Sequence, residues 1–381
     1  MMRKGQMLPF LGPHLRFDGP THVWYQGQRL LYCAGTDYHR LGFETTVQKA
    51  VQQAMQQQGL GAGGSRVTTG NNILLKELET ALAEFFGVEA ALVVGSGYLA
   101  NLVLLQAVRS RFDVVLADAQ AHASLVDAIR AVGLPMEYFQ HRDASDLQNR
   151  LRAWQGKAVL VVTDGIFAAR GEIAPLDAYW QLVQQFNARL LVDDAHGMAV
   201  LGEKGRGTVE YFRLPFSEVW VTGTLSKGFG VFGGVILGNH ELIQSVVKHS
   251  AAFVGHTPMP LAILAGAKAA VTFLRQHPQR IHHLQERTLT ARQQLQQAGL
   301  TLFAGPMPII SVAFPEEEGI TAFERHCLQA GVFPPFNRYP GAPAGGHFRF
   351  VITSRHTNAQ VQQLLNTIIT FVQKSKVLLW P

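Results

Sequence analysis

The chain has 381 residues, of which 47% are hydrophobic and 16% charged, and its formal net charge at pH 7 is +6. This length and apolar content suit a large domain with its own core and a second, smaller domain. The basic residues are scattered rather than clustered, so the sequence does not indicate binding to nucleic acid. The two cysteines, Cys33 and Cys327, exclude a disulfide framework in practice, and no metal-ligand spacing is present.

No membrane or secretion signal is evident. The first residues, MMRKGQMLPFLGP, carry basic side chains without a sustained apolar run after them, so no signal peptide is predicted. The uncharged stretch Ala90–Val108 has the length of a membrane span, but Gly95, Gly97 and polar residues interrupt it. It reads better as a strand, a glycine turn and a helix. We therefore expect a soluble, cytoplasmic protein without a membrane span.

Short runs of Val, Leu and Ile alternate with helical patterns over the first two thirds of the chain. We predict strands at Ala91–Gly95, Val114–Ala117, Glu137–Phe139, Ala158–Thr163, Arg189–Asp193, Glu218–Thr222 and Gly234–Leu237. Helices are predicted between most of them, for example at Leu75–Phe86, Tyr98–Arg109 and Leu176–Phe186. Near-continuous apolar strands separated by helices are typical of a mostly parallel sheet that helices cover on both faces. The sequence therefore predicts an α/β protein of the doubly wound class.

The pattern changes near Met259, where two long helices are predicted at Pro260–Leu274 and about Arg280–Ala298. The elements predicted after them are a strand (Ile309–Phe314), a helix (Ile320–Gln329), a loop rich in Pro and Gly (Phe333–Gly346), a strand (Phe348–Thr353) and an amphipathic helix (Asn358–Lys374). This order indicates a smaller α+β domain. We expect an N-terminal segment at 1–45, a large α/β domain at 46–258, and linking helices with the small domain at 259–381.

The stretch GTLSKGFGVFGG contains the dinucleotide-binding pattern G-x-G-x-x-G at Gly228, Gly230 and Gly233. That pattern requires the glycines to open a helix, whereas the residues that follow, from Gly234 onward, read as a strand. Lys227 stands directly before the glycines and just after a predicted strand. A covalent role for this lysine is therefore a better interpretation than a nicotinamide site.

A lysine that forms a Schiff base with pyridoxal 5′-phosphate (PLP) needs a carboxylate opposite the ring nitrogen, because that charge keeps the pyridinium protonated. Asp193 ends a predicted strand in LLVDDAHG, and His196 follows three residues later. Ligands bind at the carboxyl ends of parallel strands, where both Asp193 and Lys227 are predicted. An acidic residue at a strand end can also simply cap a loop, but together with Lys227 we favour a functional role.

The phosphate and the face of the ring also need partners. In GSGYLAN, the backbone N–H groups of Gly97 and Tyr98 are predicted at a helix N-terminus, which is an anion site, although a plain tight turn explains the glycines equally well. Thr224, three residues before the lysine, could add a hydroxyl. His122, in DAQAHASL, could stack on the ring and move protons, although a lone histidine is more often structural.

Six motifs follow one another along the chain: GAGGSRVTTG at residues 61–70, GSGYLAN, DAQAHASL, TDGIFAARGEIAPL, VDDAHGMAVLGEKGRG and GTLSKGFGVFGG. In order and spacing they resemble the α-oxoamine synthase family, which are PLP enzymes of fold-type I. The resemblance extends from about Tyr38 to the C-terminus. It implies a fold-type I PLP-dependent transferase, with a mostly parallel sheet in the large domain and a smaller α+β domain at the C-terminus.

The resemblance also implies four catalytic residues that would contact the cofactor. Lys227 would be the Schiff-base lysine, and Asp193 would pair with the ring nitrogen. His196 would bond the phenolic oxygen, and His122 would stack on the ring.

By the same resemblance, Gly97, Tyr98 and Thr224 would hold the phosphate. Thr257, in HTPMP, would reach the phosphate of a neighbouring subunit, which implies a homodimer with shared active sites. Arg349, in HFRFVIT, would grip the carboxylate of the amino acid, a role that suits a bidentate guanidinium. Without that role, Arg349 would be a surface charge at a strand edge. No metal is implied.

The chain departs from the family pattern at three places. Ala168-Ala169-Arg170-Gly171 stands where Ser-Met-Asp-Gly is usual, Asp164 stands where a glutamate is usual, and Thr36-Asp37-Tyr38-His39-Arg40 replaces a stretch of the Asn-Asp-Tyr-Leu-Gly type. The resemblance puts these positions near the substrate-facing wall. These departures bear on the identity of the acyl substrate more than on that of the cofactor.

The implied reaction is a decarboxylating condensation of an amino acid with an acyl thioester, carried on coenzyme A or an acyl carrier protein, that leaves a 2-aminoketone. We expect L-alanine and a pimeloyl thioester as substrates, with acetyl-, aminolevulinate- and palmitoyl-type members of the family as alternatives. A fold-type I aminotransferase, which needs no thioester, stays open as a second class. A non-catalytic regulator would add a DNA-binding domain that we do not find before the sheet, and a cysteine desulfurase would need a cysteine in a catalytic loop.

Overall fold

The computed structural model describes residues 12–338, 342 and 345–375. Packing divides the chain into two compact units, each described here by itself. The larger unit contains Thr36–Phe167 and Ile173–Gln285, and the smaller unit contains the chain up to Gly35, Ala168–Glu172 and the chain from Glu286 onward. The bounds of these two units differ from those of the predicted domains 1–45, 46–258 and 259–381. The domain division stays a prediction.

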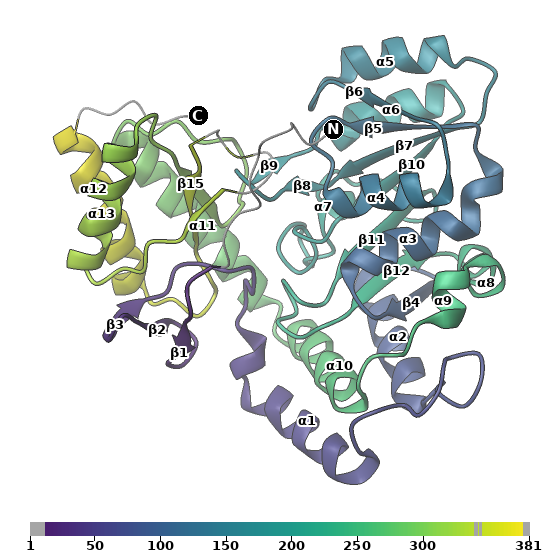
Figure 1. The fold of residues 1–381 in the computed structure, drawn as a ribbon, viewed down its shortest axis with the longest axis horizontal. Helices are drawn as coiled ribbons and strands as arrows, with labels where there is room; N and C mark the ends of the chain where they lie inside the picture. The colour runs from purple at the N-terminus through teal and green to yellow at the C-terminus, as the bar shows by residue number, and fades with distance from the viewer. Residues whose placement is uncertain (1–11, 339–341, 343–344, 376–381) are drawn as a thin grey trace. The chain divides into compact units, whose positions relative to one another are not determined.

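A seven-stranded sheet in the order β4-β12-β11-β10-β7-β5-β6 forms the centre of the larger unit (Figure 1). Its strands are β4 (Ala90–Val94), β5 (Val114–Asp118), β6 (Met136–Phe139), β7 (Val159–Asp164), β10 (Arg189–Asp193), β11 (Val219–Thr224) and β12 (Gly234–Gly238). The run from β11 to β6 is parallel, and β12 is antiparallel to both of its neighbours. Every strand predicted in this part of the sequence is present, so the mostly parallel α/β fold is confirmed.

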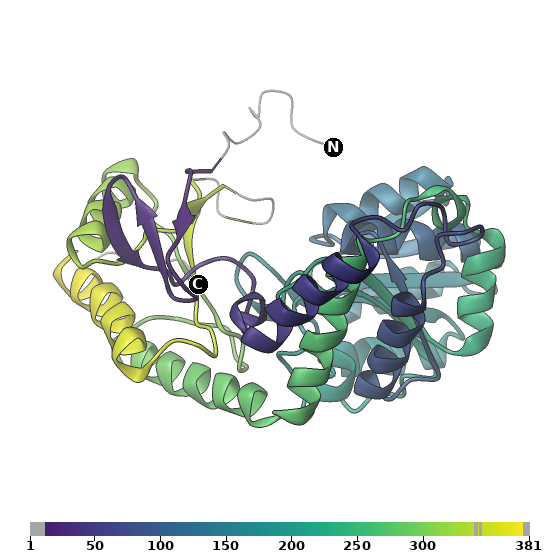
Figure 2. The same cartoon turned by 90° about the horizontal axis from the view of Figure 1, so that it is seen from below.

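Helices cover both faces of this sheet (Figures 1 and 2). Those of the larger unit are α1 (Thr45–Gln58), α2 (Ile73–Phe86), α3 (Gly97–Val108), α4 (Ala123–Val132), α5 (Ala144–Ala153), α6 (Leu176–Gln185), α7 (Thr208–Tyr211), α8 (His240–His249), α9 (Ala251–Gly255) and α10 (Leu261–Gln276). Successive residues of a strand face opposite sides. In β10, Leu190 and Val192 pack in the apolar layer with α2, α6 and α10, while Leu191 packs in the layer with α3, α4 and α8. Burial on both faces explains why the strands read as unbroken apolar runs.

The smaller unit contains two antiparallel sheets of three strands each. The first comprises β1 (Arg16–Phe17), β2 (His22–Tyr25) and β3 (Gln28–Leu31), and the second comprises β13 (Ile309–Val312), β15 (His347–Val351) and β14 (Phe336–Asn337). The helices α12 (Glu317–Gln329), α13 (Asn358–Ser375) and the later part of α11 (Gln279–Gln297) belong to this unit. The structure also contains β8 (Ile166–Phe167) and β9 (Glu172–Ile173). The first sheet was not predicted from the sequence.

Parts of two predicted segments, the N-terminal stretch 1–11 and positions 339–341 and 343–344 of the Pro/Gly-rich loop, lie outside the described residues. Among the residues that the structure does describe, no helix is both long and apolar enough to span a bilayer.

Candidate active site

The predicted site residues of the larger unit gather at the carboxyl ends of neighbouring strands. Asp193 is the last residue of β10, Thr224 is the last residue of β11, and Lys227 lies half-buried in the loop after Thr224. The strand register places Asp193 beside Thr222 of β11 and beside Asp164 of β7. Residues that the sequence separates by about thirty positions are therefore adjacent on one edge of the sheet.

Charge effects show that Lys227, Asp193 and His122 share one environment. The pKa of His122 is lowered, first by burial and then by the charge of Lys227, while the charge of Asp193 acts in the opposite direction. The pKa of Asp164 is raised well above its usual value by burial and by the negative charge of Asp193, and Lys227 opposes this shift. The lysine and the carboxylate predicted to surround a PLP ring thus lie close enough for their charges to act on the imidazole of His122 and on Asp164.

Asp193 is 6% exposed and has one donor on each carboxylate oxygen. Its Oδ1 accepts a hydrogen bond from the backbone N–H of Ala195 at 3.1 Å, and its Oδ2 accepts one from the Asn101 side chain at 2.7 Å. A carboxylate oxygen can accept more than one hydrogen bond, so this arrangement leaves capacity for a ring N–H. Asn101, fully buried in α3, is a site residue that the sequence reasoning missed.

His122 caps α4 with its own ring. Its Nδ1 accepts from the backbone N–H of Ser124 at 3.2 Å and lies 2.8 Å from the Ser124 hydroxyl. The backbone N–H of His122 donates to Asp164 Oδ2 at 2.7 Å, which ties the start of this helix to the end of β7. The ring of Tyr98 lies edge-on at 6.3 Å between centroids. The position of His122 is thus fixed through both its backbone and its ring.

His196 is held by Tyr38, which lies in the stretch Thr36–Arg40, where the chain departs from the family pattern at Thr36, His39 and Arg40. The Oη of the fully buried Tyr38 lies 2.7 Å from His196 Nδ1. The neighbouring His39 is also fully buried, and its Nε2 lies 2.6 Å from the carbonyl oxygen of Ala199. Burial lowers the pKa of His39 to about 4, so its imidazole is neutral at physiological pH.

The predicted phosphate site is built where α3 begins. α3 starts at Gly97, and the hydroxyl of Ser96 accepts the N–H of Leu99 at 3.2 Å. A Cβ on Gly97 would lie only 2.8 Å from Thr224 Cβ, so glycine permits the close approach of the helix start to the end of β11. The hydroxyl proton of Thr224 is directed to the Gly233 carbonyl at 2.8 Å. Thr224 would therefore have to turn its hydroxyl to donate to a phosphate.

The glycines after Lys227 form a turn rather than the start of a helix. Gly230 has φ +64° and Gly233 has φ +123°, and β12 begins at the next residue, Gly234. A Cβ on Gly230 would meet the Asp37 carboxylate at 2.7 Å. Because a strand rather than a helix follows these glycines, the geometry agrees with the rejection of a dinucleotide site.

The remaining predicted residues lie apart from this cluster in the sequence. Thr257 is exposed after α9. In the smaller unit, Arg349 of β15 donates from Nε to the Ala168 carbonyl at 2.6 Å and from Nη1 to the Gly35 carbonyl at 3.2 Å. Its Nη2 is buried and has no hydrogen-bond partner among the described residues. An unpaired guanidinium N–H is what a carboxylate ligand would satisfy.

Arg170, which stands where the family usually has an aspartate, lies in the same unit. Its Nε donates to Glu172 at 2.7 Å, and its guanidinium lies 4.8 Å from the centre of the Phe303 ring. The charges of Arg349 and Arg170 add to burial in lowering the pKa of His347 to about 4. The substituted segment is thus anchored by an ion pair and adds positive charge near Arg349.

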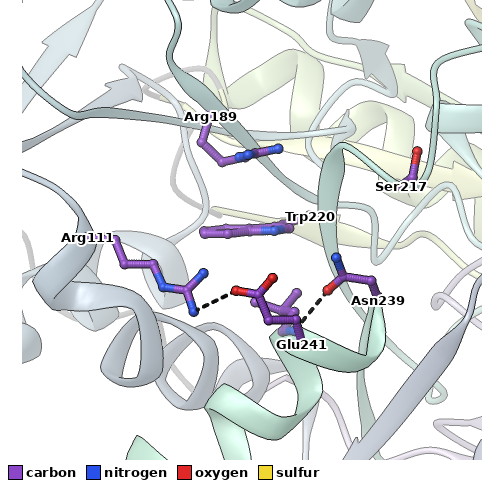
Figure 3. A pocket seen from close by; sticks show the side chains of 7 residues that line it. Arg111, Arg189, Ser217, Trp220, Asn239 and Glu241 are labelled. Carbon is purple, nitrogen blue, oxygen red and sulfur yellow. Dashed lines mark hydrogen bonds and ion pairs between the residues drawn. The ribbon is translucent and has the colours of Figure 1, made fainter.

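A pocket of about 150 Å³ lies at the other ends of the strands (Figure 3). Its lining includes Arg189, the first residue of β10, and Trp220, near the start of β11, with Arg189 over the Trp220 ring at 5.6 Å. Arg111 and Glu241 form an ion pair of 3.5 Å beside them. None of the predicted site residues lines this pocket.

The residues at the carboxyl edge fit PLP. A buried carboxylate with spare acceptor capacity suits the ring nitrogen, and the helix start at Gly97 suits the phosphate. The charges of both Asp193 and Lys227 act on His122. Among the described residues, no cluster of His, Cys, Asp and Glu could hold a metal ion.

Comparisons with known proteins agree with this geometry. The family model described as Aminotransferase class I and II matches residues 36–368. The chain is 35% identical over 355 residues to 8-amino-7-oxononanoate synthase 1 of Bacillus subtilis (strain 168), covering 92% of this chain and 90% of that protein. It is 35% identical over 368 residues to the 8-amino-7-oxononanoate synthase of Stutzerimonas stutzeri (strain A1501), covering 96% and 94%.

Among solved structures, the chain is similar to a serine palmitoyltransferase from S. paucimobilis with PLP and myriocin bound. The TM-score is 0.88 at 27% sequence identity, covering 94% of this chain and 91% of that chain. The chain therefore belongs to the aminotransferase class I and II family, within its α-oxoamine synthase branch, as the six motifs predicted.

Proposed function

We propose that the chain is a PLP-dependent α-oxoamine synthase that joins an amino acid to an acyl thioester, with loss of carbon dioxide, to give a 2-aminoketone. L-Alanine and a pimeloyl thioester are the leading substrates, because the relatives compared above are 8-amino-7-oxononanoate synthases. The observation that carries the proposal is the shared environment of Lys227, Asp193 and His122 at the carboxyl edge of the sheet.

In this proposal PLP, when bound, supplies a ring that withdraws electrons from the α-carbon of the amino acid. Asp193 holds the ring nitrogen, and its negative charge favours the protonated form of that nitrogen. The N–H groups of Gly97 and Tyr98, in the first turn of α3, hold the phosphate together with Thr224. Lys227 would hold the cofactor covalently.

The chain's own side chains handle the proton and the substrate carboxylate. Lys227 Nζ would be the base for the α-proton of the amino acid. The lowered pKa of His122 favours its neutral form, and this ring would stack on the cofactor. Tyr38 contacts the ring of His196, which would bond the phenolic oxygen of the cofactor. Arg349 binds the carboxylate of the amino acid through the N–H that has no other partner in the described residues.

The assembly is part of the same proposal. We infer a homodimer in which the exposed Thr257 of one subunit reaches the phosphate held by the other. The thioester carrier is coenzyme A or an acyl carrier protein. The location is cytoplasmic, and no nucleic acid takes part.

Two other functions have specific support. The similarity to a serine palmitoyltransferase favours serine with a longer acyl chain, and the name of the family model favours transfer of an amino group to a keto acid. A panel of glycine, alanine and serine against thioesters of several chain lengths separates them when the aminoketone is identified by mass. We expect product from alanine and the pimeloyl thioester. Amino transfer to a keto acid, without any new carbon–carbon bond, would overturn the proposal.

A further inference from the structure

One buried side chain, Asn101, connects both sides of the proposed cofactor site. Asn101 is fully buried in α3 and makes three side-chain hydrogen bonds to three different elements. It accepts from the hydroxyl of Thr222 in β11 at 2.6 Å. Its Nδ2 donates to Asp193 at the end of β10 at 2.7 Å and to the hydroxyl of Ser124 in α4 at 2.9 Å. Both N–H groups and the carbonyl of this amide are therefore in use.

The orientation of the Asn101 amide is fixed by its partners. If the amide were turned over, its oxygen would face the carboxylate of Asp193, and two acceptors would oppose each other without a proton between them. With the nitrogen toward Asp193, the amide oxygen faces Thr222, whose hydroxyl can donate to it. Asp193 thus selects one orientation of Asn101, and Thr222 stabilises the same orientation.

The chain of hydrogen bonds extends from Asn101 through Ser124 to His122. The Ser124 hydroxyl accepts from Asn101, so its own proton is available for His122 Nδ1 at 2.8 Å. The backbone N–H of Ser124 points to the same nitrogen at 3.2 Å. A nitrogen that receives these two donors cannot carry a proton, so the proton of a neutral His122 lies on Nε2.

The position of Asn101 along α3 suits this role. Asn101 follows Gly97 by four residues, so the two lie on the same face of the helix, one turn apart. The first turn of this face is where the proposed phosphate donors lie. The next turn carries the donor to Asp193. One helix face therefore contributes to both ends of the site.

We propose that Asn101 and Ser124 are positioning residues that hold the Asp193 carboxylate in place and fix His122 as the neutral tautomer with its proton on Nε2. The inference rests on the proposed function, because these two side chains matter together only if PLP lies between them. The charged groups that face His122 are Asp193, Lys227 and Asp127, and Asp164 binds its backbone.

The test uses the holoenzyme and variants that remove one hydroxyl at a time. Ser124→Ala removes a donor that stabilises the unprotonated Nδ1, so His122 should take up a second proton at higher pH than in the wild type. Histidine ¹⁵N NMR, with the His122 signal assigned from a His122→Gln protein, reads both the tautomer and this titration. The pH profile of α-proton exchange in alanine should shift in the same direction.

Thr222→Val keeps the shape of the side chain but removes the proton that orients Asn101. We expect α-proton exchange to slow by about 3- to 10-fold, the size of one neutral hydrogen bond, and Thr222→Ser, which retains the hydroxyl, should restore most of the loss. The visible band of bound PLP should change in Thr222→Val and return in Thr222→Ser.

Ser245→Ala is the matched control. Ser245 is a buried serine of α8 whose hydroxyl donates to the Ala107 carbonyl at 3.3 Å and accepts from Arg111 at 3.3 Å. It should leave the NMR titration, the exchange rate and the visible band unchanged.

The inference is overturned if His122 titrates alike in Ser124→Ala and the wild type, or if Thr222→Val behaves like Thr222→Ser. Absence of PLP binding in the wild type would instead overturn the proposed function, while the tautomer of His122 would still test the hydrogen-bond chain.

Discussion

Asp193 and Asp164 are direct register partners at the ends of the adjacent parallel strands β10 and β7. Burial and the charge of Asp193 raise the pKa of Asp164 well above its usual value, which favours its protonated form. The two neighbouring carboxylates therefore lie in different electrostatic environments, because a negative charge on Asp193 disfavours one on Asp164. Asp164 serves a different purpose, since its Oδ2 accepts the backbone N–H of His122.

This asymmetry predicts opposite outcomes for two matched substitutions. Asp193→Asn removes the charge proposed to face the ring nitrogen, and α-proton exchange in alanine should fall by roughly 100- to 1000-fold. Asp164→Asn replaces a group that is already favoured as neutral and keeps an acceptor for His122, so exchange should stay within about 10-fold of the wild type. Deuterium uptake followed by NMR measures both. Equal losses in the two variants would contradict the assignment of the charge to Asp193.

The covalent role of Lys227 can be read directly by mass. Borohydride should bleach the visible band of the PLP-loaded protein and fix the mass of the cofactor on the peptide that contains Lys227. Lys204 and Lys248 provide the comparison, because they lie in the same unit but outside the cluster at the carboxyl edge. A label on either of these lysines would show that the site is misplaced.

Asp194 predicts a dependence of stability on pH that is independent of the cofactor. Burial is the main cause that raises its pKa to about 7 from the ordinary 3.8, and the N–H of Thr208 bonds its Oδ2 at 2.7 Å. Between these two values the folded state binds more protons than the unfolded state, so the free energy of unfolding falls as pH rises from about 4 to 7.

Asp194→Asn removes this titration. The stability of the wild type relative to Asp194→Asn should therefore fall by about 2–3 kcal/mol between pH 5 and pH 8. Urea unfolding at the two pH values measures the difference. A gap between the proteins that does not change with pH would show that Asp194 does not titrate in this range.

The sequence predicted the central sheet because its strands are buried on both faces and separated by helices, a pattern that few other folds produce. It could not predict the strand order, which places β12 between β11 and β4. The N-terminal hairpin was missed although it has a local signal. Gln26 and Gly27 adopt φ 48° and 77° between β2 and β3, and a residue pair ending in glycine between alternating strands favours such a turn.

The sequence predicted those site residues that lie within recognisable motifs. Asn101 was missed because a polar residue within the apolar helix α3 shows no partner in the sequence. Its partners Asp193, Ser124 and Thr222 come from three other elements, and only the folded sheet brings them together. The same holds for Tyr38, whose hydroxyl meets His196 across a long stretch of chain.

Arg349 predicts a selective loss of amino-acid affinity. Its guanidinium is held by two backbone carbonyls, so Arg349→Ala should remove the carboxylate contact, worth about 1.5–3 kcal/mol. The apparent affinity for the amino acid should fall by roughly 10- to 100-fold, with little change in the dependence on thioester. Arg325→Ala, at an exposed position of α12, is the control. A loss confined to the thioester would move Arg349 to the acyl side.

The close approach of α3 to β11 predicts that a single methyl group disturbs the phosphate site. By helix propensity alone, Gly97→Ala should stabilise α3 by about 0.5–1 kcal/mol. The added Cβ, however, would lie 2.8 Å from Thr224 Cβ and 3.3 Å from the Gly223 carbonyl, so the start of the helix must move away from β11. We expect PLP to bind roughly 10- to 100-fold more weakly, a loss of about 1.4–2.7 kcal/mol that several displaced N–H donors would explain. Gly255→Ala places the same methyl group on a helical glycine with open space around it, and it should bind PLP normally. Titration of PLP into the apo-proteins decides the matter: wild-type affinity together with a higher melting temperature in Gly97→Ala would mean that the helix start does not hold the phosphate.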